Sequence, residues 1–399
     1  MNVLFMTIAY PKAGEHNIYS DLMQEFVLGN HKVFIACSCE RRNNKETDLT
    51  IEEGKNVLRI KTGNMTGNIN IIEKGISTLL IESAFIKAIN KFFVNTKFDL
   101  IIYSTPPITF VRAVQYFKNR DKAYTYLLLK DIFPQNAVDI KLMNNSSLIY
   151  CYFRNKERKL YSISDFIGCM SQANVEYILD KNHELDIIRV EICPNSIATT
   201  AIINIDNLHR KKYNIPDDCV VFVYGGNLGR PQGVDFIIEC LKKNMNLVNR
   251  FFIICGQGSD YYKLETFFSN MKPNNALLFK MLPKSEYDDL LLCCDVGLIF
   301  LDHRFTIPNF PSRLLSYMEY SMPVLACTDR NTDIGEILQR GNFGWWCESN
   351  NSDGFSEIIN RICLQKNEIS LYGNNAREYL EENYTSKTSY EIIMRHFVE

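Results

Sequence analysis

Residues 221–235 read VFVYGGNLGRPQGVD, and this stretch decides the fold. An apolar run ends at the glycine pair Gly225 and Gly226, and an apolar helical pattern begins at Val234. This order predicts a buried strand, a tight glycine turn and a helix, with free backbone N–H groups that suit a phosphate. Arg230 lies inside the turn, where its guanidinium could meet a diphosphate. An ordinary turn, whose glycines serve only the backbone, stays open as the alternative.

Length and composition set the limits on the rest of the chain. A chain of 399 residues predicts two domains, and 46% hydrophobic with 23% charged residues is typical of a globular protein. The net charge of −2 gives no support to a nucleic-acid partner. The 13 cysteines form no CxxC pair, which argues against a metal site and favours a reduced, cytoplasmic compartment. We find no signal-peptide pattern and no apolar run long enough to span a membrane.

Strand and helix patterns alternate along the whole chain. Residues 40–70 are polar with poor periodicity, which predicts loops and short edge strands, whereas 71–94 carry the apolar stripe of a long helix. The alternation predicts an α/β protein with two doubly wound parallel sheets that meet near residue 198. Ligands of such sheets bind at the carboxyl ends of the strands. The strands are expected at residues 3–8, 31–36, 100–103, 123–129, 166–171, 187–193, 220–224, 251–255, 276–279, 296–300 and 323–326.

Several loops after these strands resemble, as an ordered set, the family 4 glycosyltransferases of GT-B architecture. The motifs that carry the resemblance are the early glycine loop at Gly14, YGGNLGRPQG (224–233), CGQG (255–258), LPKSEY (282–287), IPNFPSRLLSYME (307–319) and MPVLA (322–326). The resemblance implies two Rossmann-like domains facing a cleft. It further implies an acceptor-binding domain at 1–198, a nucleotide-sugar-binding domain at 199–380, and a tail at 381–399 whose helix returns to the first domain.

Two further segments resemble transferases that build capsule and O-antigen repeat units, in particular those that handle N-acetyl-fucosamine (FucNAc). These segments are KDIFPQNAVD (130–139) and SDFIGCMS (164–171). The resemblance implies a retaining hexosyltransferase that uses a UDP-sugar as donor and a polyprenyl-diphosphate-linked sugar as acceptor. It implies no cofactor and no metal ion, and the chain contains no Asp-x-Asp motif.

The chain departs from the family at the donor site. Many members carry two glutamates eight positions apart, where this chain has Pro308 and Ser316. Many also carry an Arg and a Lys in the first glycine turn, where this chain has Asn227 and Gln232. Arg230 and Arg313 could replace the missing positive charges. For the missing carboxylate, the candidates are Glu319 and Glu348.

The resemblance then assigns roles to individual residues. Arg230 and Arg313 stabilise the charge that develops on the departing diphosphate, and Asp131 orients or deprotonates the acceptor hydroxyl. A surface arginine, a helix-surface arginine and a turn-capping aspartate are the respective alternatives. Ser312 is expected to cap the helix that follows it. The implied donor site comprises Gly14, Gly226, Asn227, Gly229, Lys280, Asn309, Ser312 and Glu319, and the implied acceptor site comprises His16 and Lys130.

Residues 150–161 mix four basic residues with four aromatic ones. This composition suits the headgroup region of an anionic membrane, and a solvated helix packed through its aromatics is the alternative. We expect a peripheral enzyme on the inner face of the plasma membrane, held there through this segment.

Other enzyme classes share parts of this pattern. An NAD-linked oxidoreductase needs G-x-G-x-x-G, and Tyr261 stands where the third glycine belongs after Gly256 and Gly258. A sugar-nucleotide epimerase of the same architecture, and a catalytically weak scaffold in a capsule-assembly complex, both stay open.

Overall fold

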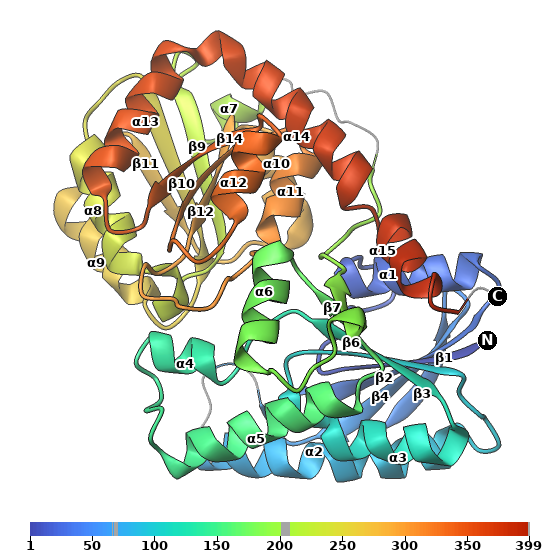
Figure 1. The fold of residues 1–399 in the computed structure, drawn as a ribbon. Helices are drawn as coiled ribbons and strands as arrows, with labels where there is room; N and C mark the ends of the chain where they lie inside the picture. The colour runs from blue at the N-terminus through green and yellow to red at the C-terminus, as the bar shows by residue number, and fades with distance from the viewer. Residues whose placement is uncertain (66, 68–70, 201–207, 398–399) are drawn as a thin grey trace. The chain divides into compact units, whose positions relative to one another are not determined.

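The computed structural model describes residues 1–65, 67, 71–200 and 208–397, which form two compact units. Unit 1 comprises Met1–Ala198 together with Thr385–Glu399, and unit 2 comprises Thr199–Tyr384. Each unit is built on its own sheet with helices on both faces (Figure 1). The α/β class with two doubly wound sheets is therefore confirmed.

The described part of unit 1 forms an eight-stranded sheet in the order β3-β4-β2-β1-β5-β6-β7-β8. All neighbours are parallel except β3 and β4, which pair antiparallel at one edge. The order reverses direction between β1 and β5. The strands are β1 (Asn2–Thr7), β2 (Lys32–Glu40), β3 (Asp48–Glu52), β4 (Lys55–Thr62), β5 (Leu100–Ser104), β6 (Tyr124–Leu129), β7 (Phe166–Cys169) and β8 (Val190–Ile192).

Helices cover both faces of this sheet, because the strands are apolar on both sides. In Figure 1, α2, α3 and α5 lie along one face, and α1 and α15 lie side by side on the other. Helix α1 begins in a capping box, in which the Asn17 side chain and the Ser20 side chain bond each other's backbone. The helices are α1 (Ile18–Leu28), α2 (Ile71–Phe92), α3 (Val111–Asp121), α4 (Gln135–Asp139), α5 (Leu148–Ile163), α6 (Gln172–Lys181) and α15 (Ser386–Met394).

The last helix, α15, packs against α1 in unit 1. The ring of Tyr390 meets that of Phe26 edge-on at 4.9 Å between centroids, and Ile393 is fully buried. The side chain of Glu25 accepts a hydrogen bond from Ser386 at 2.8 Å. Apolar burial together with these polar contacts attaches the end of the chain to unit 1.

The described part of unit 2 forms a six-stranded, fully parallel sheet in the order β11-β10-β9-β12-β13-β14. Here the order reverses between β9 and β12. The strands are β9 (Val220–Asn227), β10 (Arg250–Gln257), β11 (Ala276–Phe279), β12 (Val296–Phe300), β13 (Val324–Thr328) and β14 (Gly344–Glu348). The helices are α7 (Leu208–Lys212), α8 (Val234–Asn244), α9 (Tyr261–Met271), α10 (Lys284–Leu291), α11 (Arg313–Glu319), α12 (Ile334–Arg340), α13 (Ser352–Leu364) and α14 (Ile369–Asn383).

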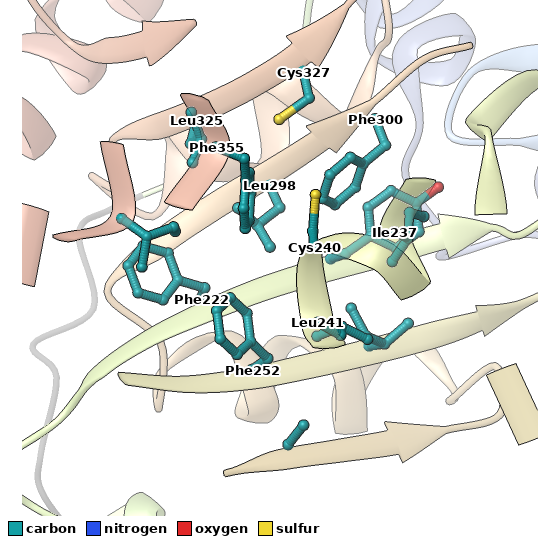
Figure 2. Close-up of a cluster of buried hydrophobic side chains, with 14 of the residues drawn as sticks. Phe222, Ile237, Cys240, Leu241, Phe252, Leu298, Phe300, Leu325, Cys327 and Phe355 are labelled. Atoms are coloured by element: carbon teal, nitrogen blue, oxygen red, sulfur yellow. The ribbon is translucent and has the colours of Figure 1, made fainter. Parts of the chain in front are cut away.

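The core of unit 2 lies between the sheet and the helices α8, α9 and α13. Figure 2 shows Phe222 from β9, Phe252 from β10 and Phe300 from β12 meeting Phe355 of α13 in one cluster. Phe222 and Phe252 stack at 5.4 Å between ring centroids. This packing fixes the central strands, whose carboxyl ends carry the loops of interest.

Two strands differ from the sequence-based expectation. Residues 55–62 form β4, an eight-residue strand inside the sheet rather than a loop or edge, because Lys55 is buried with its ammonium bonded to Gln24 and Glu53. Strand β14 was not expected at all. In addition, β9 continues through Gly225 and Gly226 to Asn227, so the turn begins later than the sequence suggests.

Candidate functional site

Each sheet has a switch point, where the strand order reverses and the loops on either side diverge. Such points are the usual ligand sites of open α/β sheets. In unit 2 the point lies between β9 and β12, so the site residues come from the turn after β9 and from the 301–312 loop after β12. In unit 1 the point lies between β1 and β5.

The glycine turn of unit 2 differs from the simple strand–turn–helix that the sequence predicts. A short 3-10 helix, Arg230–Gln232, lies between β9 and α8. The expected array of free N–H groups is partly occupied, since the N–H of Leu228 bonds the carbonyl of Gln257 and that of Gly229 bonds the Gln232 side chain. Two backbone N–H groups of the turn are thus bonded within the protein.

Gly226 lies directly against the side chain of Arg313, which belongs to α11. Its φ is +137°, and a Cβ placed there would lie 2.0 Å from Nη2 of Arg313. A Cβ at Gly225 would in the same way lie 1.9 Å from the hydroxyl of Tyr287. The glycine pair therefore makes room for Arg313 and Tyr287 at the carboxyl end of β9.

Arg313 is the first residue of α11, and its guanidinium is drawn into the protein. The central guanidinium carbon lies 4.2 Å from the centroid of the Tyr224 ring, a cation–π contact. Its Nε is buried without a hydrogen-bond partner, and no carboxylate pairs with it among the described residues. The helix-surface alternative for Arg313 is therefore wrong. A buried cation without a counter-charge is costly, and an incoming anion would offset that cost.

Other residues of the glycine turn are exposed or hydrogen-bonded within the turn. Arg230 is exposed, and within the described chain no ion pair to it is found. The Asn227 amide donates to the Gln232 side chain at 2.8 Å, so a neutral pair occupies the two positions where the resemblance implied an arginine and a lysine. Gly229 lies between this pair and the 3-10 helix.

The loop that follows β12 contributes polar groups without partners. The side-chain nitrogen of Asn309 is buried and unbonded. The backbone carbonyl of Asn309 accepts a hydrogen bond from the Thr332 hydroxyl at 2.7 Å. Ser312 is the N-cap residue of α11, as expected, but its side chain makes no capping hydrogen bond. Nδ2 of Asn309 and Nε of Arg313 are thus both unused donors near one strand end.

Three further residues expected at the donor site lie elsewhere or are engaged. Glu319 is the last residue of α11, about 9 Å along the helix from Arg313, and its carboxylate accepts from Thr200 at 2.8 Å. Glu348 is held by Arg330 at 2.7 Å. Lys280 is 79% exposed and lies 3.9 Å from Glu265. Neither glutamate is a free replacement for the missing carboxylates.

In unit 1, Lys130 and Asp131 follow β6. Both backbone N–H groups bond the Thr105 hydroxyl, at 3.0 and 3.1 Å, which joins the loops after β5 and β6. Burial raises the pKa of Asp131 to about 6, although a hydrogen bond from Asn136 at 2.7 Å favours its charged form. This carboxylate is not the N-cap of α4, but it bonds Asn136 in the turn that follows, so the turn-capping alternative stays open. A carboxylate with this pKa is ionised at neutral pH and can accept a proton.

Lys130 and the residues of the first glycine loop have different surroundings. Burial lowers the pKa of Lys130 to about 8, and its ammonium donates to the Cys193 carbonyl at 3.3 Å. Gly14 has a φ of +81° with open space around it. His16 is 64% exposed and lies 3.2 Å from the buried Asp21. Sequence reasoning missed Tyr19, a partly buried tyrosine close to Ser104 and Asp131.

Three of the four basic residues at 150–161 form ion pairs within unit 1. Arg154 pairs with Glu157, Lys156 with Glu82, and Arg158 with Glu184. Tyr161 is buried. What α5 exposes instead is its apolar first turn, in which Leu148 is 89% exposed.

Two general properties complete the description of the site. Along 1–65, 67, 71–200 and 208–397, no helix is both long and apolar enough to cross a membrane. Over these same residues, no three side chains of His, Cys, Asp or Glu converge as a metal site would require.

Comparison with known proteins agrees with this geometry. Residues 206–379, which lie in unit 2, match the family model described as glycosyl transferases group 1. A probable glycosyltransferase of Pseudomonas aeruginosa, WbjE, is 26% identical over 66% of this chain and 66% of its own length. The chain matches about two thirds or less of the length of the curated relatives.

Solved structures match over nearly the whole chain. The Anabaena protein HepE in complex with UDP-glucose is 13% identical, with a TM-score of 0.70 over 99% of both chains. WaaG, a glycosyltransferase involved in lipopolysaccharide biosynthesis, is 14% identical, with a TM-score of 0.67 over 98% of this chain and 99% of its own. At these identities the likeness shows the fold, which is GT-B. The family model and the relatives support a group 1 glycosyltransferase.

The unpaired guanidinium generates a first prediction. Millimolar pyrophosphate should raise the melting temperature of the wild type, because an anion that binds only the folded state stabilises it. Arg313→Met should fold and lose most of this shift, and Arg340→Met, which removes an exposed arginine of α12, should keep it. Calorimetric melting curves of the three proteins are the measurement. An equal shift in all three would place the anion away from Arg313.

Proposed function

We propose that the chain is a retaining glycosyltransferase that moves a sugar from a UDP-sugar to a polyprenyl-diphosphate-linked acceptor in capsule or O-antigen biosynthesis. The observation that carries the proposal is the guanidinium of Arg313, buried without a carboxylate partner at the switch point of unit 2. Transfer from a nucleotide sugar leaves a nucleoside diphosphate, so negative charge grows on the phosphate in the transition state. A fixed positive charge lowers that barrier.

The comparisons support the general activity and the kind of pathway in this proposal. A glycosyltransferase of polysaccharide or lipopolysaccharide biosynthesis agrees with the family model and with the similarity to WaaG, which is involved in lipopolysaccharide biosynthesis. A UDP-sugar donor agrees with HepE, solved with UDP-glucose. N-acetyl-fucosamine as the sugar rests on the motifs at 130–139 and 164–171.

Each unit supplies one part of the chemistry in this proposal. In unit 2, Arg313 meets the diphosphate, and the exposed Arg230 supplies a second cation from the neighbouring turn. In unit 1, Asp131 accepts the proton of the acceptor hydroxyl, since its raised pKa makes it a better base than an ordinary aspartate. No residue in this scheme calls for a metal ion.

A cavity of unit 1 supports an amphiphilic acceptor. It has a volume of about 740 Å³ and lies between the end of β4 and the first turns of α2. Arg41, Lys61 and Glu73 line a charged edge, where Arg41 pairs with Glu73 and Lys61 pairs with Glu46. Ile76, Leu80 and Ile81 form an apolar wall. The apolar wall suits the hydrocarbon chain of a lipid-linked sugar.

Apolar side chains on the helical face of α2 and α5 support attachment to the inner face of a membrane. Helices α2 and α5 run along the same face of the sheet, joined by Lys156 and Glu82 at 3.5 Å (Figure 1). They expose the side chains of Ile76, Leu79, Leu80, Leu148, Ile149 and Tyr152. Since most basic groups of α5 are paired, we propose that these apolar groups, rather than charge, hold the enzyme at the membrane.

The proposal predicts that transfer depends on both arginines. Arg230→Ala and Arg313→Ala should each slow transfer about 10- to 1000-fold, the scale for loss of one transition-state donor. Arg361→Ala on α13 serves as the matched control. Product formation from a panel of UDP-sugars with lipid-linked acceptors, in chelator, is the measurement.

Several results of that assay would count against the proposal. Turnover without acceptor would identify an epimerase, and no turnover with any donor would favour a scaffold. Activity lost in chelator and restored by Mn²⁺ would overturn metal independence. Wild-type rates in both arginine variants would place the diphosphate elsewhere.

Asp131 predicts a pH dependence for transfer. Because its pKa is about 6, kcat/KM should fall about tenfold per pH unit below pH 6, as the carboxylate takes up a proton, and should level off above it. Asp131→Asn should lower kcat/KM by about 10²- to 10⁴-fold and abolish this acid limb. Asp139→Asn in the neighbouring α4 should leave both unchanged. An unaltered acid limb in Asp131→Asn would remove Asp131 from catalysis.

Sedimentation with liposomes tests the membrane contact. Leu148→Ser with Ile149→Ser should reduce binding to anionic vesicles several-fold, because two exposed apolar groups no longer leave water. Arg154→Gln with Arg158→Gln should bind like the wild type, because both arginines are already paired. The reverse ranking, or no binding by the wild type, would contradict the proposed contact.

A further inference from the structure

A carboxylate at the end of β13 has one oxygen without any partner. Asp329 follows β13 directly and is 1% exposed. Its Oδ1 accepts the N–H groups of Asn331 at 2.8 Å and Thr332 at 3.1 Å, whereas its Oδ2 is buried and bonded to nothing. No ion pair to Asp329 is found among the residues that the structure describes. Burial raises its pKa to about 6.

Two neighbouring carboxylates at this edge of the sheet, Asp302 and Glu348, are paired with arginines. Asp302, after β12, is paired with Arg304 at 2.6 Å. Glu348, at the end of β14, is paired with Arg330 at 2.7 Å. An unbonded buried carboxylate oxygen costs stability, so a partner supplied by a ligand gives a physical reason for it.

The unpaired oxygen of Asp329 belongs to the same loop region as the unpaired amide of Asn309. The Thr332 hydroxyl donates to the Asn309 carbonyl at 2.7 Å, and the Asn331 side chain donates to the Phe305 carbonyl at 2.6 Å. The turn after β13 and the 301–312 loop are therefore held against each other. Between them they carry one unused acceptor, Oδ2 of Asp329, and one unused donor, Nδ2 of Asn309.

A hydroxyl group can satisfy both atoms, because it donates one hydrogen bond and accepts another. A phosphate oxygen cannot, since an ionised phosphate offers no proton to Asp329. Neither atom is open to water in this structure, so the 301–312 loop has to shift outward when the group enters.

We infer that Asp329 and Asn309 bind a hydroxyl group of the nucleotide-sugar donor, and that Asp329 replaces the glutamates that this chain lacks at positions 308 and 316. The inference rests on the proposed function. The hydroxyl belongs either to the ribose or to the transferred sugar, and both offer the same chemistry to this pair.

The test compares Asp329→Asn with the wild type in calorimetric titrations of UDP, 2′,3′-dideoxy-UDP and UDP-glucose. The asparagine keeps an oxygen for the N–H groups of Asn331 and Thr332 but replaces the unpaired acceptor with a donor. Its melting temperature should equal or exceed that of the wild type, because a buried, incompletely paired charge is removed. Asp302→Asn is the matched control, and Asn309→Ala gives a second variant that removes the opposite member of the pair.

A ribose contact predicts that Asp329→Asn and Asn309→Ala bind UDP about tenfold or more weakly and bind dideoxy-UDP like the wild type. A sugar contact predicts that both variants bind UDP like the wild type and bind UDP-glucose about tenfold or more weakly. Wild-type affinity for all three ligands in both variants would overturn the inference and leave the proposed function standing. An equal loss for all three ligands, with a lowered melting temperature, would also overturn it, because a structural role would explain it. Absence of UDP binding by the wild type would overturn the proposed function together with the inference.

Discussion

The contact between the Arg313 guanidinium and the end of β9 is the interaction on which unit 2 depends. Glycine at 226 suits it, because the φ of +137° disfavours other residues and a Cβ there would displace the guanidinium. The contact also requires the Tyr224 ring beneath, which offers a cation a favourable face without neutralising it. The charge is thus held at the switch point without a carboxylate partner. This lowers the stability of the free protein compared with a fully paired arginine.

This arrangement bears on the two charges that the family resemblance implied in the glycine turn and that the chain lacks. The turn here is a self-contained structure, in which the Gln232 side chain binds both Asn227 and the backbone of Gly229. The positive charge comes instead from α11, whose first residue reaches back to β9 across the switch point. In the proposed anion site, the cation is therefore a side chain held by packing, which is more rigidly placed than one on a loop.

Much of the fold could be predicted from the sequence, because buried parallel strands and amphipathic helices leave clear periodic patterns. The exceptions have physical reasons. Strand β4 was obscured by its lysines and arginine, which are accommodated by specific partners such as Gln24 for Lys55. In the candidate site, Arg230 and Arg313 could be named from their motifs, but the burial of Arg313 depends on a glycine in a distant strand. Glu319 was misplaced because its position along α11 takes it away from the strand end. Asp329 left no signal, since only the structure shows which carboxylate lacks a partner.

The central claim is that the anion site of unit 2 is built around Arg313, and a crystal structure of the full chain grown with UDP tests it most directly. The account predicts a diphosphate oxygen within hydrogen-bond distance of the Arg313 guanidinium, at the carboxyl end of β9. A well-ordered diphosphate bound elsewhere, with Arg313 still unpaired against Tyr224, would contradict the account.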